Sequence, residues 1–120
     1  MNDSKSNHHV GVIGLGAMGL GVARSLLRAG YSTHAFDLRA DVMQQFVAEG
    51  GIGAASPAEL GRACDVVVLL VVNAEQSEAA LFGADGAAPT LRPDSVVIAS
   101  ATVPPEYPVR LSRRLRERQV

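Results

Sequence analysis

The feature that most constrains the fold is a glycine-rich turn near the N-terminus, placed directly after a short apolar run. The run begins at Val10 and leads into Gly14-x-Gly16-x-x-Gly19. In such a turn the first glycine permits a tight bend, the second lets a diphosphate approach the backbone, and the third lets a helix pack closely on the strand. Backbone N–H groups at the helix start then hold negative oxygens. The turn therefore predicts a dinucleotide site, although glycine-rich turns also occur where only a positive φ angle or close packing is needed.

The residues on both sides of the turn predict a strand that enters it and a helix that leaves it. The apolar residues of the predicted strand are Val10, Val12, Ile13 and Leu15. Such a nearly continuous run is expected in a buried parallel sheet. Residues 18–29 change to helical spacing before Gly30, a residue type that commonly ends helices. The apolar residues predicted to share one face of this helix are Met18, Val22, Leu26 and Leu27.

Strand and helix patterns alternate about five times along the chain. The later predicted strands cover residues 32–36, 52–55, 66–72 and 95–99, and the later helices cover 39–49, 57–63, 74–81 and 104–120. Ser56 is expected to cap the helix that Pro57 begins. The run at 66–72 is the most β-branched and least polar, which predicts a central strand buried on both faces. The alternation predicts the α/β class, a doubly wound parallel sheet of the Rossmann type with right-handed crossovers.

Length and charge exclude several functions. With 120 residues, 48% of them hydrophobic, the chain is expected to form one soluble domain. A net charge of −1 argues against nucleic-acid and membrane-surface partners. The sequence also contains no run of about eighteen apolar residues, so no membrane span is expected.

The polar N-terminal segment, residues 1–9, is expected to be a disordered tail, with the domain at 10–120. It has no apolar core of a secretory signal, which predicts a cytoplasmic protein. His8 and His9 in this tail are expected to be solvated rather than to bind a metal. The single cysteine, Cys64, is predicted to be a buried and unreactive thiol.

The candidate ligand site lies at the carboxyl edge of the predicted sheet, where ligands of doubly wound folds bind. The glycine turn, Asp37, Asn73 and Thr102 follow four different predicted strands and are expected to meet there. The residues expected to contact the cofactor are Gly14, Leu15, Gly16, Ala17, Met18, Gly19, Asp37, Leu38, Arg39, Val72, Asn73 and Thr102.

Asp37 is the predicted selector of the cofactor. A carboxylate at the end of the second strand accepts hydrogen bonds from the adenosine ribose hydroxyls and repels a 2′-phosphate, which predicts NAD over NADP. Arg39, two residues on, is able to pair with such a phosphate, so the preference is not absolute. The alternative role of Asp37 is to cap the helix that starts near Arg39.

Two further polar residues are candidates for the nicotinamide end. Asn73 either binds the nicotinamide ribose or caps the next helix, and Thr102 either offers its hydroxyl near the nicotinamide or is an ordinary loop residue. The arginines near the C-terminus are interpreted as the solvated face of an amphipathic helix. They are Arg110, Arg113, Arg114, Arg116 and Arg118.

A catalytic base is missing from the candidates. Hydride transfer from an alcohol requires a group that takes the hydroxyl proton. The only lysine is Lys5, in the polar tail, and His34 lies within a predicted strand, where a structural role is expected. The sequence gives no evident sign that Tyr31 or Tyr107 serves as the base. We therefore assign no catalytic residue and no metal ligand.

Residues 12–30, VIGLGAMGLGVARSLLRAG, resemble the N-terminal signature of the β-hydroxyacid dehydrogenases, the family of 3-hydroxyisobutyrate dehydrogenase and tartronate semialdehyde reductase. Met18 within the glycine motif is the distinguishing residue. The run VVLLVVN resembles the family strand that ends in Leu-Pro-Asn, with Val72 in place of the proline and Asn73 retained.

Residues 97–105, VIASATVPP, resemble the family's Asp-x-Ser-Thr segment, which lines the nicotinamide and substrate site. Ala99 and Ala101 replace the Asp and the Ser, and Thr102 is kept. The combination of VVNAEQSEAALFG with SATVPPEY looks most like the L-threonate dehydrogenase branch, whose members use NAD.

The resemblance implies a cofactor domain of a longer, homo-oligomeric oxidoreductase, whose further helical domain carries the catalytic lysine. By itself the chain is then expected to bind NAD(H) without turnover of a hydroxyacid. L-threonate is the first candidate substrate, with 3-hydroxyisobutyrate and tartronate semialdehyde or glycerate as alternatives. A different interpretation, favoured by the length, is a regulatory module that senses NAD(H).

Overall fold

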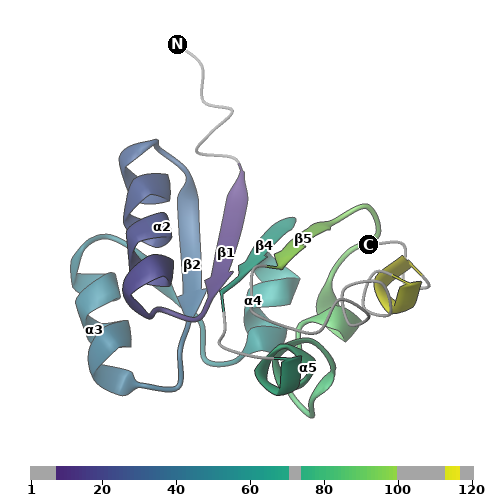
Figure 1. Ribbon diagram of the computed structural model, residues 1–120. Helices are drawn as coiled ribbons and strands as arrows, with labels where there is room; N and C mark the ends of the chain where they lie inside the picture. Colours follow the sequence, from purple (N-terminus) through teal and green to yellow (C-terminus); the bar gives the residue numbers. More distant parts are fainter. Residues whose placement is uncertain (1–7, 71–73, 100–112, 117–120) are drawn as a thin grey trace.

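The fold is a five-stranded sheet with helices on both sides. A computed structural model describes residues 8–70, 74–99 and 113–116 (Figure 1). Its elements are β1 (His9–Ile13), α2 (Ala17–Arg28), β2 (Ser32–Phe36), α3 (Ala40–Ala48), β3 (Ile52–Gly53), α4 (Pro57–Ala63), β4 (Val66–Leu69), α5 (Ala74–Phe82), the short 3-10 helix η1 (Ala88–Thr90) and β5 (Val96–Ala99).

The strands lie in the order β3-β2-β1-β4-β5, and each neighbouring pair is parallel. The chain runs outward from β1 through β2 to β3 and then returns to β4 on the other side of β1. Val12 of β1 thus has Ala35 of β2 and Val68 of β4 as its two register partners. The predicted doubly wound parallel sheet is confirmed, and the order of its strands reverses between β1 and β4.

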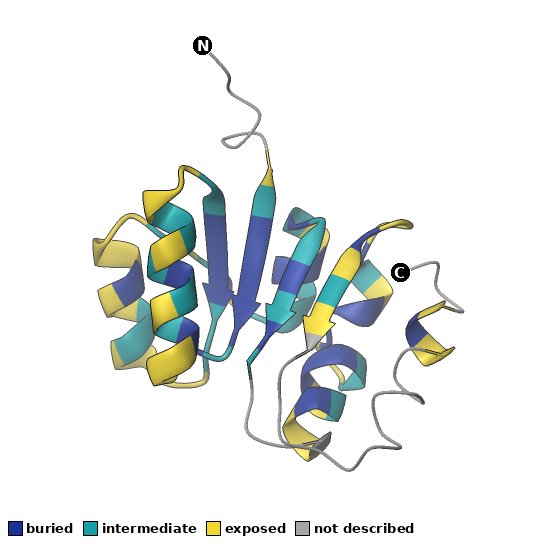
Figure 2. Ribbon diagram, turned by 45° about the horizontal axis from the view of Figure 1, so that its top comes forward, coloured by how far each residue is buried: buried dark blue, intermediate teal, exposed yellow. Residues whose placement is uncertain are grey.

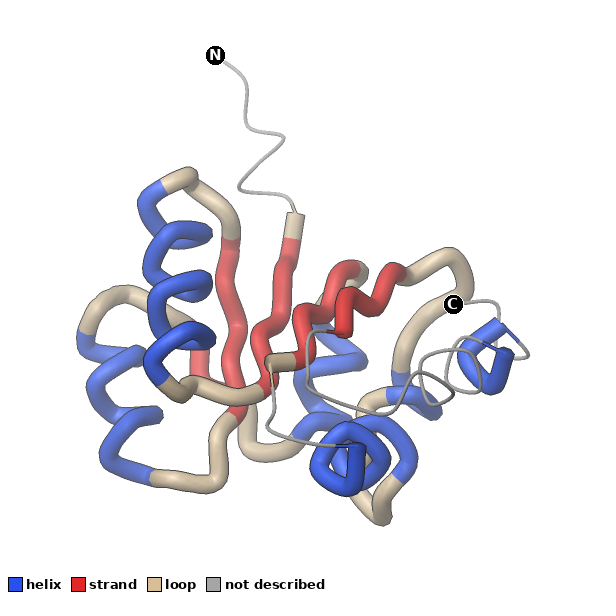
Figure 3. The backbone as a smooth tube through the Cα atoms, in the orientation of Figure 1, coloured by secondary structure: helices blue, strands red, loops and turns tan. Residues whose placement is uncertain are grey.

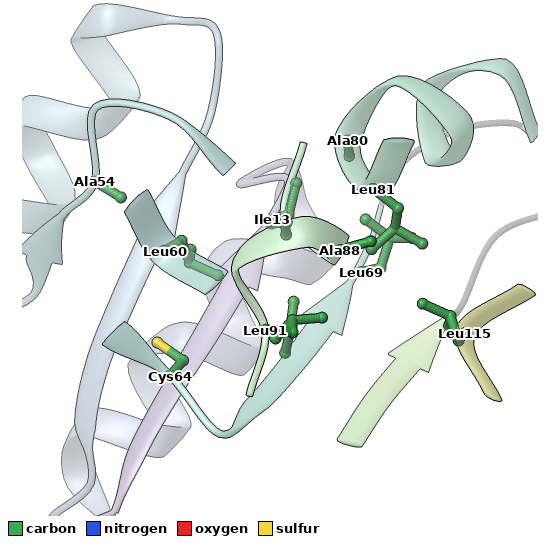
Figure 4. Close-up of a cluster of buried hydrophobic side chains, with 12 residues drawn as sticks. Ile13, Ala54, Leu60, Cys64, Leu69, Ala80, Leu81, Ala88, Leu91 and Leu115 are labelled. Carbon is green, nitrogen blue, oxygen red and sulfur yellow. The ribbon is translucent and has the colours of Figure 1, made fainter. Parts of the chain in front are cut away.

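A layer of helices packs on each face of the sheet (Figure 3). On one face, α2 and α3 bury a cluster centred on Val12, Ala35 and Phe46. On the other face, α4, α5 and η1 bury a second cluster, which includes Leu60, Leu69, Leu81 and Leu91 (Figure 4). The middle of β1 and β2 is therefore buried, while the outer sides of α2 and α3 are exposed (Figure 2). The turns that follow β1 and β2 lie at the carboxyl edge of this sheet.

Several local predictions hold. Ser56 Oγ accepts a hydrogen bond of 3.1 Å from the amide of Glu59, and Pro57 is the first residue of α4, as expected for this cap. Cys64 is fully buried, and burial together with the charge of Asp65 raises the pKa of its thiol to about 12. The thiol therefore stays protonated and unreactive.

Other predictions need correction at the strand ends. β1 ends at Ile13, so Leu15 belongs to the turn, where its side chain is nevertheless buried. β3 is shorter than the predicted 52–55. β4 is buried on the face of Val67 and Leu69 but only partly buried on the other. Among the described residues, the α2–α3 layer does not extend over β5, whose Val96 and Ile98 are half-exposed.

The predicted packing of α2 is wrong at its first turn. Met18 is 69% exposed, and the buried residues of this helix are Gly19 and Ala23. The reason is position, because the first turn of α2 lies at the edge of the sheet, where Ile13 has already ended β1. Met18 therefore projects beyond the sheet rather than onto it.

The N-terminal boundary also differs from the expectation. β1 begins at His9, inside the predicted 1–9 tail, and residues 1–7 lie outside the described part of the chain. His9 is not simply solvated: its Nδ1 lies 2.9 Å from Nε2 of His34 on the neighbouring strand, within hydrogen-bonding distance. Of the predicted final helix, residues 113–116 are described and are helical. Within the described segments, none of the helices has the length and apolar character required to cross a bilayer.

Candidate functional site

The site is built on the glycine turn between β1 and α2. Gly14 has a φ of 99°, a conformation that L side chains rarely adopt, and its amide donates a 2.9 Å hydrogen bond to the carbonyl of Phe36 at the end of β2. A Cβ added at Gly19 would lie 1.8 Å from the carbonyl oxygen of Gly14. The first glycine therefore makes the bend, and the third lets α2 pack against the turn, as predicted.

The middle glycine is different. A Cβ added at Gly16 would meet no atom of the described residues within 4 Å, apart from its chain neighbours. The backbone angles of this residue, φ −66° and ψ −172°, are open to any residue type. Neither the backbone geometry nor the packing of the described residues thus requires glycine here. The position on the outer side of the turn lets an external group approach the backbone.

The start of α2 offers hydrogen-bond donors next to the exposed side of Gly16. Gly16 is the N-cap, and none of the described side chains caps the helix. The first intrahelical bond runs from the Leu20 amide to the Gly16 carbonyl at 2.8 Å. The amides of Ala17, Met18 and Gly19 precede that bond, so α-helical geometry leaves them without an intrahelical acceptor. No acidic residue lies in the first turn. The positive end of the dipole of α2 therefore lies beside Gly16.

Asp37 links the glycine turn to the end of β2. Its Oδ2 accepts hydrogen bonds from the Leu15 amide at 2.7 Å and from Arg39 Nη2 at 3.2 Å. Its Oδ1 accepts from the Arg39 amide at 2.9 Å and from Arg39 Nε at 3.0 Å. The carboxylate thus fixes the turn after β1 against the turn after β2.

The surroundings of Asp37 keep it ionised. Burial alone would raise its pKa, but the hydrogen bonds from the Arg39 side chain and from the Arg39 and Leu15 amides, with the charge of Arg39, outweigh burial. They lower the pKa of Asp37 to about 2. The site therefore presents a carboxylate, not a carboxylic acid, at neutral pH.

The alternative role of Asp37 as a helix cap is not what is seen. The N-cap of α3 is Arg39, and no side chain that the structure describes makes a capping hydrogen bond there. Asp37 instead bonds the amide two residues ahead, as in an Asx-turn. Leu38, between the two charged residues, is 90% exposed. Together with Met18 it places an apolar side chain at the carboxyl edge of the sheet.

The remaining predicted site residues divide into two groups. Leu15 does not present its own groups outward, because its side chain is buried and its amide is bonded to Asp37. Val72, Asn73 and Thr102 lie outside the described residues. Leu70 is the last described residue before that gap, and its amide donates a 2.9 Å hydrogen bond to the carbonyl of Ile13, the last residue of β1.

The predicted structural role of His34 agrees with its surroundings. It is buried in β2 and pairs with His9, and burial and the charge of His9 lower the pKa of its imidazole. What sequence reasoning missed is the network around Asp37. An acid two residues before an arginine was a local signal for their pairing, but no sequence pattern indicates the bond to Leu15.

Comparisons with known proteins agree with this geometry. The family model for the NAD binding domain of 6-phosphogluconate dehydrogenase matches residues 9–120. The L-threonate dehydrogenase of Cupriavidus necator is 62% identical over 111 residues, which are 92% of this chain and 37% of that protein. The L-threonate dehydrogenase of Haemophilus influenzae is 38% identical, with the same two shares.

A solved structure gives the same result. The crystal structure of 3-hydroxyisobutyrate dehydrogenase from Salmonella typhimurium matches with a TM-score of 0.88 and 42% identity, over 93% of this chain and 39% of that one. The chain thus spans well under half the length of these relatives. The resemblance to the β-hydroxyacid dehydrogenases is confirmed. Since the family model matches nearly the whole chain, the chain belongs to the family of NAD-binding domains represented by that of 6-phosphogluconate dehydrogenase.

Proposed function

We propose that this domain holds NAD(H) across the carboxyl edge of its sheet, with the diphosphate over Gly16 and the adenosine ribose at Asp37. The observation that carries the proposal is the contrast among the three glycines of the turn. Gly14 and Gly19 are required by backbone conformation and packing, whereas the described part of the chain gives neither reason at Gly16, which is exposed. A diphosphate needs such an approach to the backbone, and the amides of Ala17, Met18 and Gly19 supply its hydrogen bonds.

The adenosine end is assigned to the turn after β2. An ionised Asp37 accepts hydrogen bonds from ribose hydroxyls and repels a 2′-phosphate, so we expect at least tenfold tighter binding of NAD than of NADP. The exposed apolar side chain of Leu38 offers a surface for the adenine ring. Val72, Asn73 and Thr102 remain our candidates for the nicotinamide end.

For the complete protein we propose hydride transfer between NAD and a small hydroxyacid. Bound NAD supplies the hydride acceptor, and the chain supplies its binding and orientation. The identity of 62% to the L-threonate dehydrogenase of Cupriavidus necator supports L-threonate as substrate ahead of 3-hydroxyisobutyrate and tartronate semialdehyde or glycerate. We expect the complete protein to be a homo-oligomer.

The 120 residues alone are proposed to be inactive. Their only lysine, Lys5, lies outside the described residues. His34 is buried and bonded to His9, so it is not placed to take a proton from a hydroxyacid. A lysine from a further domain is the proposed base.

The test compares this chain with a protein that also carries the helical domain of the L-threonate relatives. NADH formation from NAD⁺ and L-threonate is followed by absorbance. We expect turnover only with the longer protein. Turnover by the 120-residue chain would contradict the proposal that it lacks a catalytic base. If the longer protein oxidises 3-hydroxyisobutyrate but not L-threonate, the proposed substrate is wrong and 3-hydroxyisobutyrate takes its place.

A further inference from the structure

The carboxylate of Asp37 is fully used by donors of the protein itself. An ionised carboxylate offers about four acceptor positions, two on each oxygen. Oδ1 takes the amide and Nε of Arg39, and Oδ2 takes the amide of Leu15 and Nη2 of Arg39. A ribose hydroxyl that bonds to Asp37 must therefore displace one of these donors.

The four donors are not equally replaceable. The Leu15 and Arg39 amides are fixed by the backbone of the two turns, and each occupies one oxygen. The other two donors belong to the guanidinium of Arg39, on a side chain that is 56% exposed, whereas that of Asp37 is only 10% exposed. An ion pair with such an exposed partner contributes little free energy. The guanidinium is therefore the group that gives way.

We propose that the Arg39 guanidinium occupies the two acceptor positions that the 2′,3′-diol of the adenosine ribose takes, and that the cofactor displaces it. This inference rests on the proposed NAD(H) site. The diol and the guanidinium each bring two donors to the same two oxygens, so they compete one for one. Arg39 is then a specificity-determining residue that weakens binding of NAD while it holds Asp37 in place.

The displaced guanidinium also changes the discrimination against NADP. Asp37 alone would repel a 2′-phosphate, but a guanidinium released two residues away offers that phosphate a charge-assisted hydrogen bond. Arg39 therefore lowers the affinity for NAD and raises the affinity for NADP, so the difference between the two affinities becomes smaller. Its removal favours NAD and disfavours NADP.

The test is Arg39→Met, which keeps an unbranched stem and removes the donors. Affinities for NAD⁺ and NADP⁺ are measured by calorimetry on the full 120-residue chain. We expect NAD⁺ to bind about two- to fivefold tighter, the range set by loss of an exposed ion pair, and NADP⁺ to bind about tenfold weaker. The increase in affinity caused by Arg39→Met should be smaller for NAD⁺ that carries 2′-deoxyadenosine, because this analogue has one hydroxyl fewer to replace the guanidinium.

The matched control is Arg24→Met. Arg24 makes an equivalent bidentate ion pair with Glu49, between α2 and the end of α3. Its Nε and Nη2 lie 2.7 and 2.8 Å from the two carboxylate oxygens. The change in net charge is the same, and we expect no change in either affinity. Arg39→Gln checks that the result does not depend on methionine, and circular dichroism checks folding of each variant.

The outcomes separate this inference from the proposed function. If wild type binds NAD⁺ and both Arg39 variants, correctly folded, bind it equally well or more weakly, the competition is wrong and the proposed site stands. If wild type and all variants fail to bind NAD⁺, the proposed function itself is wrong. If Arg24→Met shifts the two affinities as Arg39→Met does, the effect is one of net charge and the inference is overturned.

Discussion

The amide of Leu15 donates a 2.7 Å hydrogen bond to Oδ2 of Asp37, across 22 positions of sequence. Leu15 lies in the glycine turn and Asp37 directly follows β2, so this bond joins the two turns to which we assign the diphosphate and the ribose. The geometry of the proposed site is thus partly set by an interaction within the protein.

The charge of Asp37 should contribute to stability in a defined pH range. Its pKa of about 2 lies below that of an unfolded aspartate, about 4, so the contribution is present above about pH 4 and is lost as the pH falls toward 2. We expect Asp37→Asn to cost about 1–2 kcal/mol of unfolding free energy at neutral pH and less at pH 3. Urea unfolding measures both values. The exposed Asp85, changed to Asn, is the control, and an equal loss in both variants would contradict the role of the network.

Gly19 should be the least replaceable glycine of the turn for folding. A Cβ there would lie 1.8 Å from the Gly14 carbonyl oxygen, so Gly19→Ala must move backbone and is expected to cost about 3 kcal/mol or more. Gly21 lies in the same helix, and a Cβ added there meets no other described residue within 4 Å outside the backbone of that helix. Gly21→Ala should therefore stabilise the chain by about 0.5–1 kcal/mol. Denaturant midpoints measure the difference, and equal midpoints would mean that α2 does not pack as described.

The pair of His9 and His34 should make folding sensitive to mild acid. Burial and the charge of His9 lower the pKa of His34, so the folded chain binds this proton less readily than the unfolded chain. The free energy of unfolding should therefore fall as the pH drops below about 6.5, the ordinary pKa of histidine. His34→Gln should remove this dependence, and His8→Gln, at an exposed position, should leave it. Unfolding at pH 7 and pH 5 tests this, and an unchanged slope in His34→Gln would refute it.

The sequence was sufficient for the architecture because its signals are local. The glycine motif and the alternation of apolar strands with helical patterns predict β1, α2, β2 and the doubly wound sheet, and Ser56-Pro57 predicts the start of α4. Boundaries were harder to predict. Leu15 is predicted as a strand residue because it continues the apolar run that starts at Val10, but the bend at Gly14 has already ended β1.

Contacts between distant segments could not be predicted in this way. The bond from Leu15 to Asp37 and the approach of His9 to His34 depend on how β1 and β2 align, which no local pattern records. The exposure of Met18 depends on where the first turn of α2 lies relative to the sheet edge. Asp37 itself could be identified from its position after β2. The hydrogen bonds by which Arg39 occupies its acceptor positions could not be predicted.

The most direct test of the NAD(H) site is calorimetric titration of NAD⁺ into three forms of the 120-residue chain. These are wild type, Gly16→Ala and Gly21→Ala. In both variants the added Cβ meets nothing within 4 Å in the segments that the structure describes. We predict that wild type and Gly21→Ala bind alike, whereas Gly16→Ala binds at least tenfold more weakly with a stability within about 1 kcal/mol of wild type. Binding of NAD⁺ by Gly16→Ala with wild-type affinity would contradict the placement of the diphosphate over the glycine turn.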